Sequence, residues 1–314
     1  MVDLSVKFCG IQFDTPVAMA SGNAGYGIEY QSVSGFSNRD AGAVFLKGTT
    51  LEPKLGNKPE RVMESPSGLL NSIGLQNPGA KAVIRDYLPQ LDMTQSRFII
   101  NVSGSSIEEY AEVVRLFNDT DLPAIEVNIS CPNVKKGGAA FGNDPDMAAR
   151  VVEACRLSTT KPLIVKLSPN QTDIAEGARR VIDAGADALS AINTLMGMQI
   201  DANTRKPTLG NNQGGLSGPA IKPVALLKVH QVYQVAKQYD VPIIGLGGIA
   251  SAEDAIEFIL AGASMVAIGS AIAKDPLIVR KVNQGIEAYL IKHNMGSVSE
   301  LTGKLNLNTD TVLC

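Results

Sequence analysis

The stretch IIGLGGIASAEDAIEFILAGASMVAIGS, residues 243–270, decides the fold because it holds one complete repeat of a larger pattern. Residues 243–246 and 265–268 are short apolar runs bounded by glycine, as buried strands are. Residues 252–261 lie between them and have the apolar periodicity of a helix. A strand, a helix and a second strand in this order predict two parallel strands joined by a crossover helix.

The same alternation runs along the rest of the chain. Apolar, β-branched runs predict further strands at residues 17–21, 43–47, 98–102, 124–128, 163–167 and 188–193. Helical patterns follow at residues 106–117, 144–157, 173–184, 222–238 and 276–293. The second of these should begin with Asp144 as its N-cap and Pro145 in its first turn. Eight strands that alternate with helices match a closed (β/α)₈ TIM barrel better than an open doubly wound sheet.

Three further segments complete the predicted architecture. Residues 4–13 alternate around Gly10 and predict an N-terminal β-hairpin that plugs the N-terminal end of the barrel. The connections at residues 48–77 and 194–219 are too long for plain turns, and long βα loops are where barrels carry their chemistry. Since no break in composition divides the chain, residues 1–314 should form a single barrel domain with long βα-loop insertions. Its tail after about residue 303 should be loosely ordered.

Bulk composition narrows the class of protein. The formal charge is −3, from 28 Lys and Arg against 31 Asp and Glu, which argues against nucleic-acid or membrane-surface binding. No apolar stretch approaches the roughly 18 residues of a membrane span, and the N-terminus lacks the layout of a signal peptide. The four cysteines, Cys9, Cys131, Cys155 and Cys314, show no metal or disulfide spacing. We therefore expect reduced thiols in a cytoplasmic enzyme.

Polar residues recur where the predicted strands end, although barrel strands should point apolar side chains inward. A salt bridge or a capped loop could explain one such residue, but five on neighbouring strands at the same end need a common reason. Together they predict a polar floor of amides and two cations, which suits an anionic, planar, hydrogen-bonding ligand and does not suit a metal. The five residues are Lys47, Asn101, Asn128, Lys166 and Asn193.

Glycines follow the last two strands, at Gly247, Gly248 and Gly269, with Ser270 next to the last of them. The loops after strands seven and eight of such barrels commonly bind a phosphate through backbone N–H groups, and the alternative is tight turns without a ligand. Residues 245–250 also fit the dinucleotide fingerprint GxGxxG/A. The acid that this fingerprint requires about 20 residues later is missing, so we reject a Rossmann NAD site.

Cys131 is the candidate for proton transfer. It follows the strand at residues 124–128 in a glycine-rich loop, ISCPNVKKGG. The two histidines, His230 and His293, fall in helix-like stretches, so a base near neutral pH must be another group. A structural role is the alternative for Cys131, and it is the expected one for the other three cysteines.

Several motifs together resemble dihydroorotate dehydrogenase of class 1. They are VNISCPNV (127–134), NSIGLQNP (71–78), ASG (20–22), FLKGTT (45–50) and GGLSGPAIKP (214–223), and the resemblance covers about residues 4–295. The stretches NVKKGGAAFG (133–142) and NTLMG (193–197) are most similar to subclass 1B. Gly48 departs from the alanine that is commoner in the family, and we expect no chemical consequence.

The resemblance implies an FMN-dependent oxidoreductase of pyrimidine biosynthesis that oxidises (S)-dihydroorotate to orotate. Cys131 would be the general base that removes the C5 proton, and a hydride would pass from C6 to N5 of FMN. The implied substrate-binding residues are Lys47, Asn71, Ser72, Ile73, Gly74, Leu75, Asn128, Asn193 and Thr194. The implied FMN-binding residues are Ser21, Lys47, Gly48, Asn101, Asn128, Lys166, Ile192, Gly218, Gly247, Gly248, Gly269 and Ser270. No metal site is expected.

Subclass 1B also implies a partner. Electrons would pass to NAD⁺ through a second subunit that carries FAD and a 2Fe–2S cluster, on a homodimer core within a heterotetramer. Two alternatives remain open: a 1A-like homodimer that uses fumarate, and a non-catalytic flavin-binding barrel.

Overall fold

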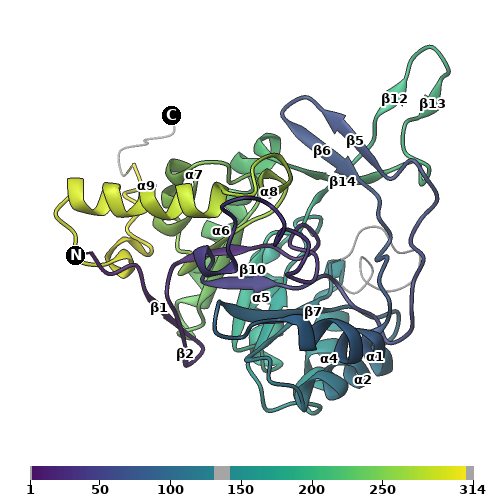
Figure 1. The fold of residues 1–314 in the computed structure, drawn as a ribbon, viewed down its shortest axis with the longest axis horizontal. Helices are drawn as coiled ribbons and strands as arrows, with labels where there is room; N and C mark the ends of the chain where they lie inside the picture. The colour runs from purple at the N-terminus through teal and green to yellow at the C-terminus, as the bar shows by residue number, and fades with distance from the viewer. Residues whose placement is uncertain (1, 131–141, 309–314) are drawn as a thin grey trace, which may run out of the picture.

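The computed structural model describes residues 2–130 and 142–308, in which eight parallel strands close into a barrel (Figure 1). Every pair of neighbouring strands around the barrel is parallel, which confirms the predicted TIM barrel. In order around the barrel the strands are β10 (Ala188–Ala191), β15 (Ile243–Leu246), β16 (Met265–Ile268), β3 (Val17–Met19), β4 (Ala43–Phe45), β7 (Arg97–Val102), β8 (Ile125–Asn128) and β9 (Leu163–Lys166).

Three of the predicted strands extend two residues too far, to Ser21, Lys47 and Asn193. The structure ends β3, β4 and β10 earlier because the chain turns into the mouth of the barrel there. The N–H of Lys47, for example, donates to the carbonyl of Gly25 in the loop after β3 (2.7 Å) and not to a neighbouring strand. The residues that leave the strands early are therefore those that line the mouth.

The helices surround the barrel near their predicted positions, and side-chain caps fix where four of them begin. Ser106, Asp144, Asp173 and Ser251 each accept hydrogen bonds from backbone N–H groups in the following turn. The N-cap at Asp144, with Pro145 in the first turn, is as predicted. The helices are α1 (Ala80–Ala82), α2 (Ile107–Asn118), α4 (Pro145–Arg156), α5 (Ile174–Asp183), α6 (Lys222–Ala236), α7 (Ala252–Leu260), α8 (Ala271–Lys274) and α9 (Ile278–Lys292), with shorter turns η1 (Asn38–Asp40), η2 (Val83–Tyr87), η3 (Leu88–Gln90), η4 (Pro219–Ile221) and η5 (Val298–Leu301).

The predicted N-terminal hairpin is present as β1 (Val6–Phe8) and β2 (Ile11–Phe13), which pair antiparallel. Two contacts place it at the N-terminal ends of the barrel strands. Cys9 Sγ donates to the carbonyl of Asp187, just before β10, and Arg97 Nε at the start of β7 donates to the carbonyl of Gln12. The buried rings of Phe8 and Phe13 meet edge to face beneath the barrel.

The two long connections do not remain separate loops, because their strands pair with each other. They form a four-stranded antiparallel sheet in the order β11 (Leu195–Gly197), β14 (Gly214–Ser217), β6 (Gly68–Asn71) and β5 (Val62–Ser65). A two-stranded arm, β12 (Ile200–Asp201) and β13 (Lys206–Pro207), extends beyond it at the upper right of Figure 1. This small sheet was not predicted, and it forms one wall over the mouth of the barrel.

Across residues 2–130 and 142–308, no helix has the length and apolar character needed to cross a membrane. At the C-terminal end of this part, Gly303 N donates to the carbonyl of Ile259 and Leu305 N to that of Leu260, both at the end of α7. The chain therefore still contacts α7 at residue 305.

Candidate active site

A cavity of about 410 Å³ lies at the C-terminal ends of the barrel strands, and the five residues of the predicted polar floor all line it. Asn101 and Asn128 come from β7 and β8, Lys166 ends β9, and Lys47 and Asn193 follow β4 and β10. The small sheet adds Asn71 from β6 and Ser217 from β14. The predicted residues that line this cavity are Ser21, Lys47, Gly48, Asn71, Ile73, Gly74, Leu75, Asn101, Asn128, Lys166, Asn193, Thr194 and Ser270.

A narrower cavity of about 80 Å³ continues from the first and is lined by the predicted glycines Gly218, Gly247, Gly248 and Gly269. The two cavities share Lys166, Asn193 and Ser270 among their lining residues. Gly247 (φ +132°) and Gly248 (φ +91°) adopt a backbone conformation that side chains disfavour. A Cβ atom at Gly248 would lie 2.9 Å from the carbonyl oxygen of Gly218.

The peptide N–H groups at this narrow end have no protein acceptor in the described part of the chain. Those of Gly247, Gly248, Gly269 and Ser270 donate to no backbone carbonyl there. Buried or half-buried N–H groups need partners, so a cluster of unpaired donors beside glycines is suited to an anion such as a phosphate.

Amide side chains of the floor are joined by hydrogen bonds. Asn128 Nδ2 donates to Asn101 Oδ1 (3.5 Å), and Asn128 Oδ1 accepts from Ser130 N (3.2 Å) and Ser130 Oγ (3.0 Å). Asn193 Nδ2 lies 3.4 Å from Asn128 Oδ1 and 2.8 Å from Ser130 Oγ. The amides therefore act as one hydrogen-bonded set that presents donors and acceptors to the cavity.

Two lysines give the cavity its positive charge. Lys166 is 4% exposed, and its Nζ donates to Ser21 Oγ (3.4 Å). Burial lowers the pKa of Lys47, while the nearby carboxylate of Glu29 acts in the opposite direction. Both lysines line the 410 Å³ cavity and can therefore attract an anionic ligand into it.

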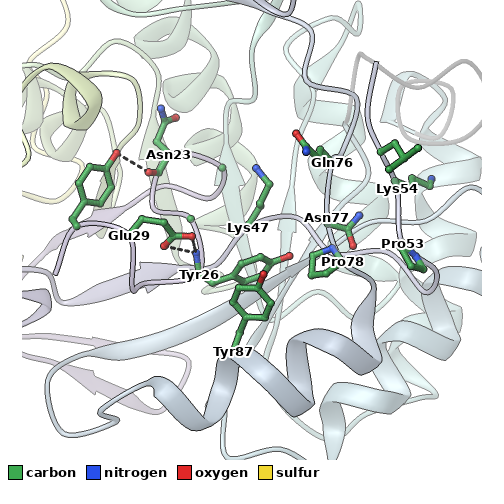
Figure 2. Close-up of a pocket in the computed structure, with 14 residues that line it drawn as sticks. Asn23, Tyr26, Glu29, Lys47, Pro53, Lys54, Gln76, Asn77, Pro78 and Tyr87 are labelled. Carbon is green, nitrogen blue, oxygen red and sulfur yellow. Dashed lines mark hydrogen bonds between the residues drawn. The ribbon is translucent and has the colours of Figure 1, made fainter. Parts of the chain in front are cut away.

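Lys47 also reaches a neighbouring cavity of about 630 Å³, which Figure 2 shows. In Figure 2, Glu29 lies to the left of Lys47 and Gln76 and Asn77 to its right, while Tyr26 and Tyr87, with ring centroids 4.5 Å apart, lie below it. Lys47 lines both this cavity and the 410 Å³ cavity, so the two are adjacent.

The comparison with known proteins agrees with this geometry. Residues 3–290 match the family model of dihydroorotate dehydrogenase. The chain belongs to the dihydroorotate dehydrogenase family. This confirms the resemblance found in the sequence motifs.

The relatives within the dihydroorotate dehydrogenase family carry the name "Dihydroorotate dehydrogenase B (NAD(+)), catalytic subunit". The protein of Desulforamulus reducens is 51% identical over 307 residues, which are 98% of this chain and 99% of the relative. That of Geotalea daltonii is 50% identical over 306 residues (97% and 99%), and that of Bacteroides thetaiotaomicron 48% over 308 residues (98% and 100%). These names match the subclass predicted from residues 133–142 and 193–197.

Among the predicted dihydroorotate dehydrogenase residues that the structure describes, Ser72 lines neither the 410 nor the 80 Å³ cavity. Ser72 is buried behind the wall, where its Oγ and its carbonyl accept from Asn57 Nδ2 (2.9 and 3.2 Å). Cys131 lies outside the described residues. Ile192 lines the 80 Å³ cavity beside the glycines.

The two free cysteines in the described residues, Cys9 and Cys155, are in environments that make a thiol unreactive. Burial raises the pKa of Cys9 to about 12, and Asp187 adds to this effect. Burial likewise raises the pKa of Cys155 to about 12, against a smaller opposite effect of Arg156. Both thiols stay protonated near neutral pH, in keeping with the structural role expected for them.

Polar residues were also missed in the sequence: Asn23 and Ser217 line both cavities, and Glu126 lies buried next to Asn101. Glu126 in β8 is 2% exposed, and its carboxylate accepts from Asn101 Nδ2 (2.5 Å) and Ser190 Oγ (2.7 Å). The signal was present, since Glu126 lies two residues before Asn128 on the same strand and therefore on the same inward face. In the described ranges, no group of three His, Cys, Asp or Glu side chains could hold a metal ion.

Proposed function

We propose that this chain is the catalytic subunit of an NAD⁺-linked dihydroorotate dehydrogenase, which oxidises dihydroorotate to orotate in pyrimidine biosynthesis. One observation carries the proposal: Lys47, Lys166 and the amides of Asn71, Asn128 and Asn193 surround a single cavity of about 410 Å³. Dihydroorotate is a small ring with one carboxylate and several amide N–H and C=O groups. Two cations and a set of amides complement both parts of such a ligand.

The chain's residues also fit flavin mononucleotide, which joins a flat ring system to a phosphate. The N–H groups of Gly247, Gly248, Gly269 and Ser270, which donate to no backbone carbonyl in the described residues, would hold the phosphate. Ser21, Gly48, Asn101, Lys166, Ile192 and Gly218 would contact the rest of the cofactor. Bound FMN supplies the hydride acceptor for the oxidation.

Lys47, Asn71, Asn128, Asn193 and Thr194 would bind the substrate, together with the backbone of Ile73, Gly74 and Leu75. The ammonium groups of Lys47 and Lys166 would stabilise the substrate carboxylate and the negative charge that grows during hydride transfer. The fixed amides would orient the ring and so reduce the entropic part of the barrier. Ser72 would support this wall through Asn57, without touching the ligand.

Cys131 would remove the proton from C5 of the substrate. His230 lies in α6 and His293 follows α9, both on the outside of the barrel, so neither can serve as the base. A free thiol with a pKa near 8.5 is only partly ionised at about pH 7, so turnover should rise toward alkaline pH.

A second subunit would carry the electrons onward to NAD⁺ through FAD and a 2Fe–2S cluster, on a homodimer core within a heterotetramer. The names of the relatives support a partner subunit and NAD⁺ as the acceptor, since they contain both "catalytic subunit" and "NAD(+)". We also propose a cytoplasmic location, because Cys9 and Cys155 are free thiols.

The test uses the purified FMN-loaded chain with dihydroorotate and three acceptors. We expect rapid reduction of an artificial dye, slow reduction of fumarate, and reduction of NAD⁺ only after co-purification with the partner subunit. Fast fumarate turnover by the chain alone would show a 1A-like enzyme instead. No reaction with the dye would contradict the proposed function.

A further inference from the structure

Glu126 is a carboxylate buried in the barrel beneath the cavity, and the reaction proposed above gives it no role. Its two oxygens each accept one hydrogen bond, from Asn101 Nδ2 (2.5 Å) and from Ser190 Oγ (2.7 Å). Asn101 and Ser190 are as fully buried as Glu126 itself. Both donors are neutral, so the carboxylate is held by hydrogen bonds from β7 and β10 and lines neither the 410 nor the 80 Å³ cavity.

The direction of these hydrogen bonds determines how the amide groups of Asn101 and Asn128 are oriented. A carboxylate accepts hydrogen bonds and donates none, so Asn101 must turn its Nδ2 toward Glu126 and its Oδ1 away. Asn101 Oδ1 can only accept in turn, which directs Asn128 Nδ2 toward it. Asn128 Oδ1 is then left to accept from Ser130 and from Asn193 Nδ2.

These hydrogen bonds form one chain that runs from Glu126 in β8 to Asn101 in β7, then to Asn128 in β8 and on to Asn193 after β10. Asn101, Asn128 and Asn193 all line the 410 Å³ cavity. The backbone of Asn128 is fixed separately, since Tyr110 Oη donates to its carbonyl (2.7 Å). With its backbone held, the side chain of Asn128 can still rotate its amide, by which N and O exchange places.

We propose that Glu126 is a positioning residue that fixes the amide orientation of Asn101, and through it that of Asn128 and Asn193. It thereby sets the pattern of donors and acceptors that the cavity offers to a planar pyrimidine. This inference rests on the proposed function, because orotate is the ligand whose recognition it explains. Glu126 itself touches no ligand.

Two substitutions separate amide orientation from charge. In Glu126→Gln the side chain keeps its length, and its carbonyl oxygen can still accept from Asn101 while its NH₂ donates to Ser190, whose hydroxyl can also accept. In Glu126→Asp the charge stays, but one methylene fewer draws the carboxylate back by roughly 1.5 Å. The contact with Asn101 Nδ2 would then lengthen from 2.5 Å to about 4 Å, beyond hydrogen-bond range.

The experiment measures the dissociation constant of orotate from its effect on the flavin absorbance of the FMN-loaded chain. We expect Glu126→Gln to bind orotate within about threefold of the wild type, and Glu126→Asp to bind at least about tenfold more weakly. A merely structural role would lower the melting temperature of both variants without this difference in affinity. The exposed Glu153 on α4 supplies the control, since Glu153→Gln makes the same chemical change far from the cavity.

Equal orotate affinities of Glu126→Asp and the wild type would overturn the inference. A tenfold loss of orotate affinity in Glu126→Gln would also overturn it, because it would show that the charge of Glu126 matters and amide orientation does not. If Glu126→Asp does not fold, Glu126→Ser repeats the test with another side chain too short to reach Asn101. A wild type that does not respond to orotate would overturn the proposed function as well. A wild type that binds orotate, together with an unaffected Glu126→Asp, overturns this inference alone.

Discussion

Replacing Gly248 by alanine tests whether the narrow end of the site holds a phosphate. Gly248 has φ +91°, and a Cβ there would lie 2.9 Å from the carbonyl oxygen of Gly218 and 3.0 Å from the backbone nitrogen of Lys222. Both neighbours are backbone atoms and cannot move aside as a flexible side chain would. The methyl group would therefore force the loop after β15 away from Gly218, and with it the free N–H groups of Gly247 and Gly248.

The expected cost follows from these two effects. A residue other than glycine in such a backbone region costs about 1–3 kcal/mol, and the overlap places Gly248→Ala at the upper end of this range. For a chain of this size, each kcal/mol lowers the melting temperature by about 2–4 °C, so we expect a fall of roughly 5–10 °C. FMN at about 1,000 times its Kd stabilises the wild type by about 4 kcal/mol, and each tenfold loss of affinity removes about 1.4 kcal/mol of that.

Thermal unfolding with and without FMN, together with fluorescence titration of FMN, provides the assay. Gly10→Ala is the matched control, because Gly10 also has a positive φ (+76°) but a Cβ there would meet no atom within 4 Å. We expect the control to melt at a lower temperature with an unchanged FMN-dependent rise, and Gly248→Ala to lose most of that rise. Wild-type FMN affinity in Gly248→Ala would refute the assignment of this loop.

Four further predictions concern the cysteines and Lys47. Cys131→Ala should slow dihydroorotate oxidation by about 10²–10⁴-fold while orotate affinity is kept, as rapid-reaction kinetics and titration can show; an unchanged rate would exclude Cys131 as the base. Iodoacetamide at pH 8 should modify Cys131 but spare Cys9 and Cys155, because burial raises the pKa of both of these thiols to about 12. Peptide mapping measures the labelling, and Cys9 or Cys155 labelled as fast as Cys131 would contradict this. Lys47→Met should weaken orotate binding at least about tenfold in a titration. Burial lowers the pKa of Lys47 from 10.5 in the folded chain, so just below pH 10.5 the unfolded chain binds the proton more strongly than the folded chain does. The free energy of unfolding of the wild type relative to that of Lys47→Met should therefore rise with pH just below pH 10.5. Denaturant unfolding at several pH values tests this, and a fall with pH would contradict it.

Most of the barrel could be predicted because its signals are local. Each strand is a short apolar run, and helix starts such as Asp144–Pro145 are marked by capping residues within a few positions. The polar residues at strand ends were also predictable, since the closure of parallel strands brings their ends together whatever the loops do.

The small antiparallel sheet could not be predicted in the same way. Its central pair joins Asn71 of β6 to Gly215 of β14, far apart in the chain, and both strands are short and contain glycine. Such pairing depends on the barrel bringing the two connections together, which no local pattern encodes. Glu126 was missed for a related reason: its partners Asn101 and Ser190 belong to other strands, so its burial becomes visible only when the barrel closes.

The most direct test of the central claim is a single-turnover reaction without oxygen. Dihydroorotate is mixed with the FMN-loaded chain in the absence of any acceptor, and flavin absorbance and orotate are followed together. We predict that the flavin bleaches and that one orotate forms for each flavin reduced. A flavin that stays oxidised in the presence of saturating dihydroorotate would contradict the account.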